Sequence, residues 1–165
     1  MSQVEWLDDR EQAVWRLYLE VSQRLWSRLT RELGDETGVS IAEYDVLVKL
    51  SEAPDRTLRM SELASRTTQS RSRVTHTVAR METAGHVARQ ASADDGRGVT
   101  ATLTDAGFAL LESAAPSHVG SVREHFISHL PNESLVQVEE VLAKMAQHLR
   151  ALDPNHAPFA PGSQE

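Results

Sequence analysis

The order of local patterns between residues 59 and 105 constrains the fold more than any other feature of the chain. Two short helical patterns come first, separated by a polar turn at 67–70, and two β-type runs follow at 87–91 and 99–103. The sequence DDGRG between these runs supplies the glycines of a tight hairpin turn. Helix, turn, helix and hairpin in this order predict a winged helix-turn-helix, mainly α with a small β-hairpin wing.

The helix that follows the polar turn has a packing side and an outward side. At about 100° per residue, its apolar residues Val74, Val78 and Met81 share one side of the helical wheel. Arg71 lies nearer this packing side, from where it could reach back to a phosphate. The opposite side carries Ser72, Arg73, His76 and Arg80. A solvated surface helix usually mixes Glu and Lys, but positions 70–81 hold no acidic residue, so we favour major-groove reading, in which arginine bonds guanine as a bidentate fork.

The hairpin turn places one arginine between two glycines. Gly96 and Gly98 permit positive φ at the tip, Arg97 could enter a minor groove, and Asp95 could hold Arg97 by an ion pair. The same turn also fits an ordinary exposed hairpin, but after a reading helix it indicates DNA contact. The predicted DNA-contacting residues are Ser70, Arg71, Ser72, Arg73, Thr75, His76, Thr77, Arg80, Asp95 and Arg97.

The charge of the chain is unevenly divided. Between residues 59 and 100, seven arginines stand against four acidic residues, a net charge of +3, although the whole chain carries −7. The remainder therefore carries −10. One basic segment in an acidic body is typical of localised phosphate binding, but a randomly uneven surface would look the same.

Long helical patterns flank the winged segment. We predict one domain over 1–152, with the winged helix-turn-helix at 40–103, dimerisation helices at 7–33 and 104–152, and a disordered proline-containing tail at 153–165. The apolar faces of the flanking helices are too extensive for one small module to cover, which favours a twofold homodimer over helices folded back on their own subunit. The boundary signals are Gly34 and Gly38 as helix ends, Ser40, Ser61 and Thr104 as N-caps, and Pro116 as a kink or break in the fifth helix.

Composition narrows the functional class. The chain has no cysteine, which excludes disulfides and thiolate metal sites, and it has no apolar run long enough to span a membrane. The N-terminus lacks a signal-peptide pattern, so a cytoplasmic location is expected. No nucleophile–base pair, glycine-rich phosphate loop or metal triad is evident, so we predict no enzyme and no cofactor.

Residues 61–107 closely resemble the core of the MarR family of bacterial transcription regulators. The matching elements are Glu62-Leu63-Ala64, the serine- and arginine-rich helix 70–82, Gly85, Val87-Ala88-Arg89, Asp95 with Arg97, and Leu103-Thr104 through Gly107. The resemblance implies a homodimeric repressor that binds a pseudo-palindromic double-stranded operator and is released by a small-molecule ligand. The wing reads Asp-Gly-Arg where many members have Asp-Arg-Arg, which should weaken the minor-groove contact.

The resemblance also implies a site for a small aromatic or phenolic effector between the dimerisation helices and the winged unit. The candidate lining residues are Trp15, Arg16, Tyr44, His118 and Arg123. Each has a simpler alternative: Trp15 and Tyr44 could be core residues, and Arg16 could pair with Glu20 one helical turn on.

The histidines of the fifth helix suggest a second kind of site. His118, His125 and His129 border its apolar stripe, and His125 and His129 stand one turn apart, a spacing that can chelate a metal. Surface or interface histidines are the more common explanation of such a pattern. The alternatives to a ligand-released repressor are therefore a metal-responsive regulator that uses these histidines and a winged helix that binds proteins rather than DNA.

Overall fold

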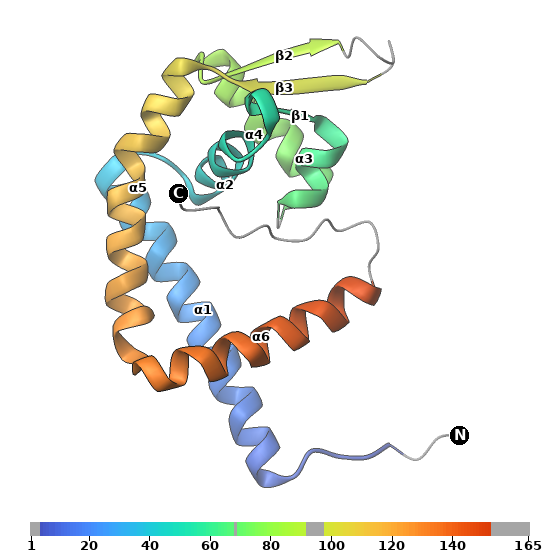
Figure 1. Ribbon diagram of the computed structural model, residues 1–165, viewed down its shortest axis with the longest axis vertical. Helices are drawn as coiled ribbons and strands as arrows, with labels where there is room; N and C mark the ends of the chain where they lie inside the picture. Colours follow the sequence, from blue (N-terminus) through green and yellow to red (C-terminus); the bar gives the residue numbers. More distant parts are fainter. Residues whose placement is uncertain (1–3, 68, 92–97, 153–165) are drawn as a thin grey trace.

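The computed structural model describes residues 4–67, 69–91 and 98–152, and the wing tip and the tail lie outside this part of the chain. Figure 1 shows a head of short helices and strands carried by long helices. The elements, in chain order, are α1 (Asp9–Thr37), α2 (Ile41–Ser51), η1 (Pro54–Arg56), β1 (Thr57–Arg59), α3 (Met60–Arg66), α4 (Arg71–Thr83), β2 (Val87–Ala91), β3 (Val99–Leu103), α5 (Asp105–His125), η2 (Ile127–His129) and α6 (Asn132–Leu152). None of the helices described is long and apolar enough to cross a membrane.

The three strands form one antiparallel sheet in the order β1-β3-β2. β2 and β3 pair as a hairpin with Val87 opposite Leu103, and both strands have the predicted bounds. β1 adds to the free edge of β3, with Leu58 opposite Ala101. The predicted winged helix-turn-helix is confirmed, with one more strand than the sequence indicated.

The core of the head lies between the sheet and α2, α3 and α4. It is aliphatic, and its most buried side chains include Leu47, Leu50, Leu63, Val74, Val78, Met81 and Val87. Val74, Val78 and Met81 are each at most 1% exposed, which confirms the predicted packing side of α4. Burial of each such side chain contributes about 1.5–3 kcal/mol, so this side fixes how α4 is rotated about its axis.

Two of the three predicted N-caps are confirmed. Ser40 forms a capping box with Glu43 at the start of α2, and Thr104 accepts a hydrogen bond from the Gly107 amide at the start of α5. The prediction for Ser61 was wrong, because α3 begins at Met60 and Arg59 occupies the N-cap position without a side-chain bond. β1 runs straight into α3, so pairing in the sheet sets that boundary.

Neither Gly34 nor Pro116 ends the long helix that contains it. α1 passes through Gly34 and ends only at Gly38, whose φ of +71° requires the left-handed region. Burial of Leu29 and Leu33 outweighs the cost of about 1 kcal/mol for a glycine in a helix. α5 likewise continues through Pro116 to His125 without being split.

Helices α1 and α5 lie side by side and are joined through Glu32 (Figure 1). Ser121 Oγ donates to the Glu32 carboxylate at 2.6 Å, His125 Nε2 lies 2.9 Å from it, and Arg28 forms an ion pair with it. The hydrogen bond from Ser121, aided by His125 and Arg28, holds the pKa of Glu32 below its ordinary value against the opposing effect of burial. This cluster holds α5 against α1.

Candidate nucleic-acid interface

The outward face of α4 carries most of the predicted DNA-contacting side chains. Ser70 caps the helix by accepting from the Arg73 amide, and Thr75 Oγ1 donates to the Arg71 carbonyl at 2.9 Å. Ser70, Arg71, Ser72, Arg73, Thr75, His76 and Arg80 are all exposed. Arg71, which the helical wheel places nearer the packing side, is exposed in the first turn of α4. Together these residues present cationic and hydroxyl groups on one helical surface.

Thr77 differs from the rest of the predicted set because it is only 4% exposed. Its hydroxyl lies 3.5 Å from Gln69 Oε1, and Gln69 Nε2 donates to the Ala42 carbonyl at 3.1 Å. These contacts join the helix-turn-helix turn to the start of α2. We therefore assign Thr77 to positioning α4. Gln69 is a positioning residue that the sequence reading missed, because a polar turn residue has no periodicity to mark it.

Arg80 stands at the last turn of α4 and bonds to α2. Its guanidinium Nη2 lies 3.2 Å from Glu43 Oε1. Glu43 was not singled out from the sequence, although it stands at the third helical position where a capping box places an acid. The ion pair brings an acidic side chain to the edge of an otherwise cationic face.

The wing is fixed to the end of α4 by a second ion pair. Arg89 Nε donates to Glu82 Oε2 at 2.9 Å, and the Arg89 amide donates to Oε1 at 3.2 Å. The hydrogen bond from Arg89 holds the pKa of Glu82 below its ordinary value. The contact joins Glu82, in the last turn of α4, to Arg89 in β2. Asp95 and Arg97, predicted to contact DNA from the wing tip, lie outside the described residues.

The five predicted effector-pocket residues do not gather at one place in the subunit. Trp15 stacks on Tyr18 with ring centroids 5.7 Å apart and is half exposed. Residue 15 lies about 25 Å along the axis of α1 from Glu32, where α1 contacts α5. Arg16 bonds Gln12 at 3.1 Å rather than the predicted Glu20, which pairs with Arg24.

Tyr44 and His118 do meet, at the contact between α2 and α5. Their ring centroids are 4.6 Å apart, and Tyr44 belongs to the core, as the simpler alternative held. Burial lowers the pKa of His118 and raises that of Tyr44, so both rings are neutral at pH 7. His118 Nδ1 and Ser117 Oγ are buried without a hydrogen-bond partner among the described residues. Arg123, by contrast, is exposed on α5.

The histidine pair predicted as a weak metal site is separated by the end of α5. His125 is in the last turn and contacts Glu32, whereas His129 lies in η2 and is exposed. The one-turn spacing assumed a continuous helix, and that assumption was wrong. Within the described ranges, no group of three or more His, Cys, Asp or Glu side chains is arranged to hold a metal ion.

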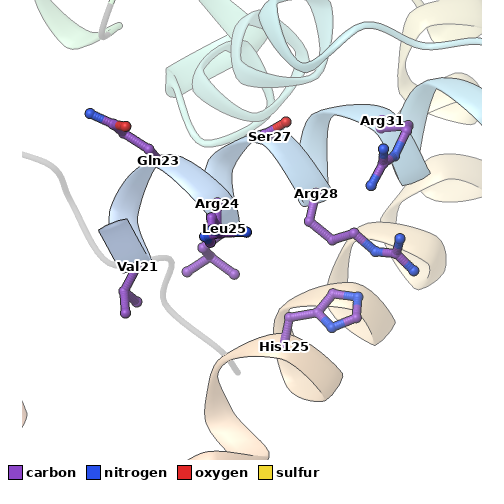
Figure 2. Close-up of a pocket in the computed structure, with 8 residues that line it drawn as sticks. All are labelled: Val21, Gln23, Arg24, Leu25, Ser27, Arg28, Arg31 and His125. Atoms are coloured by element: carbon purple, nitrogen blue, oxygen red, sulfur yellow. The ribbon is translucent and has the colours of Figure 1, made fainter. Parts of the chain in front are cut away.

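A groove of about 590 Å³ runs along α1 beside the end of α5. Figure 2 shows Arg28 and His125 reaching from the two helices toward the same region, with Arg24 and Arg31 also on the groove. Glu32 pairs with Arg28 and with His125, and Glu20 pairs with Arg24. The cationic lining is thus largely balanced by carboxylates of the same helix.

The comparisons with known proteins agree with this geometry. A model of the MarR family matches residues 37–98. The structure of Sco3205, a MarR family transcriptional regulator from Streptomyces coelicolor in complex with DNA, is 38% identical with a TM-score of 0.85, over 96% of this chain and 98% of that one. AbsC, a MarR family regulator from the same organism, is 41% identical with a TM-score of 0.83, over 90% of this chain and 99% of AbsC.

A more distant structure shares the fold. BpsR from Bordetella bronchiseptica is 22% identical with a TM-score of 0.70, over 81% of this chain and 98% of BpsR. No match is found among curated proteins. The identity to Sco3205 and AbsC extends over nearly the full length of both chains, so it includes the long flanking helices as well as the winged head. The chain belongs to the MarR family of transcriptional regulators.

Proposed function

We propose that the chain regulates transcription by binding duplex DNA through the outward face of α4, and that it acts by binding rather than catalysis. The observation that carries the proposal is the rotation of α4, which buries Val74, Val78 and Met81 and leaves its arginines exposed. Arginine and hydroxyl side chains on one exposed helix suit base edges and phosphates of a major groove. The DNA complex of Sco3205, at 38% identity, supports this assignment.

The proposal extends to the wing and to the cell compartment. Arg97, held by Asp95, would contact the minor groove next to the site of α4, because the hairpin leads away from the end of the same helix. Residues 1–152 would act as one domain that carries the winged unit 40–103. The cytoplasm is the expected location for a protein whose target is chromosomal DNA in bacteria.

A homodimer is the second part of the proposal. α6 has no buried residue, and the exposed fractions of Leu142, Met145 and Leu149 are 47%, 45% and 60%. Apolar residues of α1, among them Val14, Leu17 and Val21, are more than half exposed as well. Helices this apolar are covered by a second copy in closed twofold assemblies, and two copies of α4 would then read a pseudo-palindromic operator.

Arg73→Ala tests the reading role of α4. A bidentate arginine–guanine contact contributes about 1–3 kcal/mol of discrimination. Loss of Arg73 from both subunits should weaken binding to a selected duplex by at least about tenfold. The duplex is the one that the unaltered protein recovers from a random-sequence pool, and its affinity is measured by fluorescence anisotropy against a shuffled duplex of equal composition.

The matched control is Arg24→Ala, which removes the same charge from an exposed position on α1. Arg24→Ala should leave the ratio of selected to shuffled affinity unchanged. Equal losses in both variants, or an unchanged ratio in Arg73→Ala, would contradict the assignment of α4. A winged helix that binds only proteins would show no linear fall of log affinity with log salt for any duplex.

We further propose that a small phenolic ligand binds beside His118. Buried polar atoms in folded proteins nearly always have partners, so the unpartnered Nδ1 of His118 supports contact of this ring with a ligand or water. The Tyr44 ring next to His118 offers an aromatic surface. A ligand there would touch both the head, through α2, and the long helix α5, and could therefore alter their relative position.

Phenol should raise the unfolding temperature at pH 7.5 by roughly a few degrees at concentrations well above its dissociation constant. The lowered pKa keeps the His118 ring neutral at this pH, so Nδ1 can accept a hydrogen bond from the phenol hydroxyl. Because burial lowers the pKa of His118, the stabilisation should weaken only at a pH below the ordinary titration range of histidine, and it should be absent in His118→Phe at pH 7.5. Equal stabilisation of His118→Phe and the unaltered protein would place the ligand elsewhere.

A further inference from the structure

The contact between Arg80 and Glu43 joins the proposed reading helix to the helix that supports it. Arg80 has a side chain that is 64% exposed, whereas Glu43 is 23% exposed, and the two stand 37 positions apart in the sequence. The guanidinium is therefore accessible from outside on one side and bonded to a carboxylate on the other. It is the member of the outward set for which the described residues show an ion pair to another element.

Glu43 itself is held in place by the start of α2. Its Oε2 accepts from the Ser40 amide at 3.0 Å and from Ser40 Oγ at 2.5 Å, and its own amide donates to Ser40 Oγ at 3.3 Å. The next turn of α2 is anchored by Tyr44, Val46 and Leu47, all in the core. The carboxylate that meets Arg80 is thus fixed relative to the head, unlike the flexible partner of an ordinary surface ion pair.

A fixed carboxylate beside an arginine has two effects on an approaching phosphate. It occupies part of the donor fork of the guanidinium, and its charge repels the phosphate. When a duplex binds non-specifically, one of its phosphates can only replace the Glu43 carboxylate as the partner of Arg80. The exchange therefore contributes little to the free energy of binding. A duplex whose sequence fits α4 closely brings a base edge or a well-placed phosphate to the free side of the guanidinium while Glu43 still holds the other side.

We propose that Glu43 is a positioning residue that makes Arg80 selective, by restraining it from non-specific phosphate contacts. The inference rests on the proposed binding of DNA by α4. Glu43 acts through Arg80 and touches no DNA itself. Removing its charge should therefore strengthen binding to non-preferred duplexes more than binding to the preferred one.

Glu43→Gln is the variant that tests this role. Glutamine at the third helical position still completes a capping box, so α2 should keep its start. With Arg80 released in both subunits, affinity for the shuffled duplex should rise about three- to tenfold at low salt. The slope of log affinity against log salt should steepen by up to about two, and the ratio of selected to shuffled affinity should fall.

Three further variants isolate the pair. In an Arg80→Ala background, Glu43→Gln should change neither the slope nor the ratio. Glu62→Gln removes the same charge from the same helical position of α3, where Glu62 pairs with Arg66, and should also leave the ratio unchanged. Glu43→Asp keeps the charge but shortens the side chain, so it should weaken the contact with Arg80. Like Glu43→Gln, it should lower the ratio of selected to shuffled affinity. It serves as the test if Glu43→Gln does not fold by circular dichroism.

The outcomes separate the inference from the proposed function. Selectivity unchanged in both Glu43 variants, an equal effect of Glu43→Gln with and without Arg80, or an equal effect of Glu62→Gln would each overturn the role of Glu43. If the unaltered protein binds no duplex in a salt-dependent way, the proposed function itself fails. Salt-dependent binding with normal selectivity in Glu43→Gln leaves the function intact and removes only the inference.

Discussion

Leu142→Glu should convert the protein from a dimer to a monomer at micromolar concentration. Leu142, Met145 and Leu149 lie within about 60° of one another on the wheel of α6, and all three are exposed in the single subunit. Twofold symmetry places the substitution in the interface twice. Each copy loses about 2 kcal/mol of apolar burial, so the dissociation constant should rise about 1000-fold.

Light scattering after size-exclusion chromatography measures this change directly. The control is Gln147→Glu, which adds a charge of the same sign on the opposite side of α6, where the residue is also exposed. Gln147→Glu should remain a dimer. A dimeric mass for Leu142→Glu at the same concentration would show that α6 does not form the interface. The head should keep its circular dichroism spectrum in both variants, because its core lies in other elements.

Gly107→Ala adds a single methyl group and should strongly destabilise the fold. A Cβ at position 107 would stand 2.1 Å from the His86 carbonyl oxygen and 2.7 Å from Leu103 Cδ1. The oxygen belongs to the backbone and also accepts from the Thr104 amide at 3.1 Å, so it cannot move aside without breaking that bond. We expect a loss of about 3 kcal/mol in the free energy of unfolding, as for severe overpacking.

Thermal and denaturant unfolding provide the measurement. A loss of this size should lower the midpoint by roughly 10 °C. Gly34→Ala is the matched control, because it lies inside a helix and no atom stands within 4 Å of its added Cβ. That substitution should be neutral or stabilising by up to about 1 kcal/mol. A Gly107→Ala variant as stable as Gly34→Ala would mean that the junction between the wing and α5 is looser than described.

The winged head was predictable from sequence because its signals are local. Glycines around the hairpin and β-branched residues within it fixed both strands to the residue, and the alternation of apolar and polar positions gave the rotation of α4. Hydroxyl N-caps at Ser40 and Thr104 marked two helix starts. Each of these features depends on residues within one or two turns of each other.

The errors arose where distant contacts outweigh local preference. Gly34 and Pro116 are helix-breaking residues, yet α1 and α5 pack against each other and continue through both. The pairs Glu43–Arg80 and Glu32–His125 join helices that only the fold brings together. No spacing rule could have assigned Arg80 to Glu43, and a helical wheel that extended α5 past residue 125 put His129 on the wrong surface.

The direct junction between β3 and α5 limits how the two winged heads of a dimer can be placed on one DNA molecule. Thr104 alone separates the strand from the helix; its hydroxyl donates to the Gly85 carbonyl at 2.7 Å and its amide to His86. The head therefore follows α5 without an intervening flexible linker. In a dimer, the separation of the two reading helices would be set by the long helices, so we expect the protein to distinguish half-sites by their helical phase along the duplex as well as by their bases.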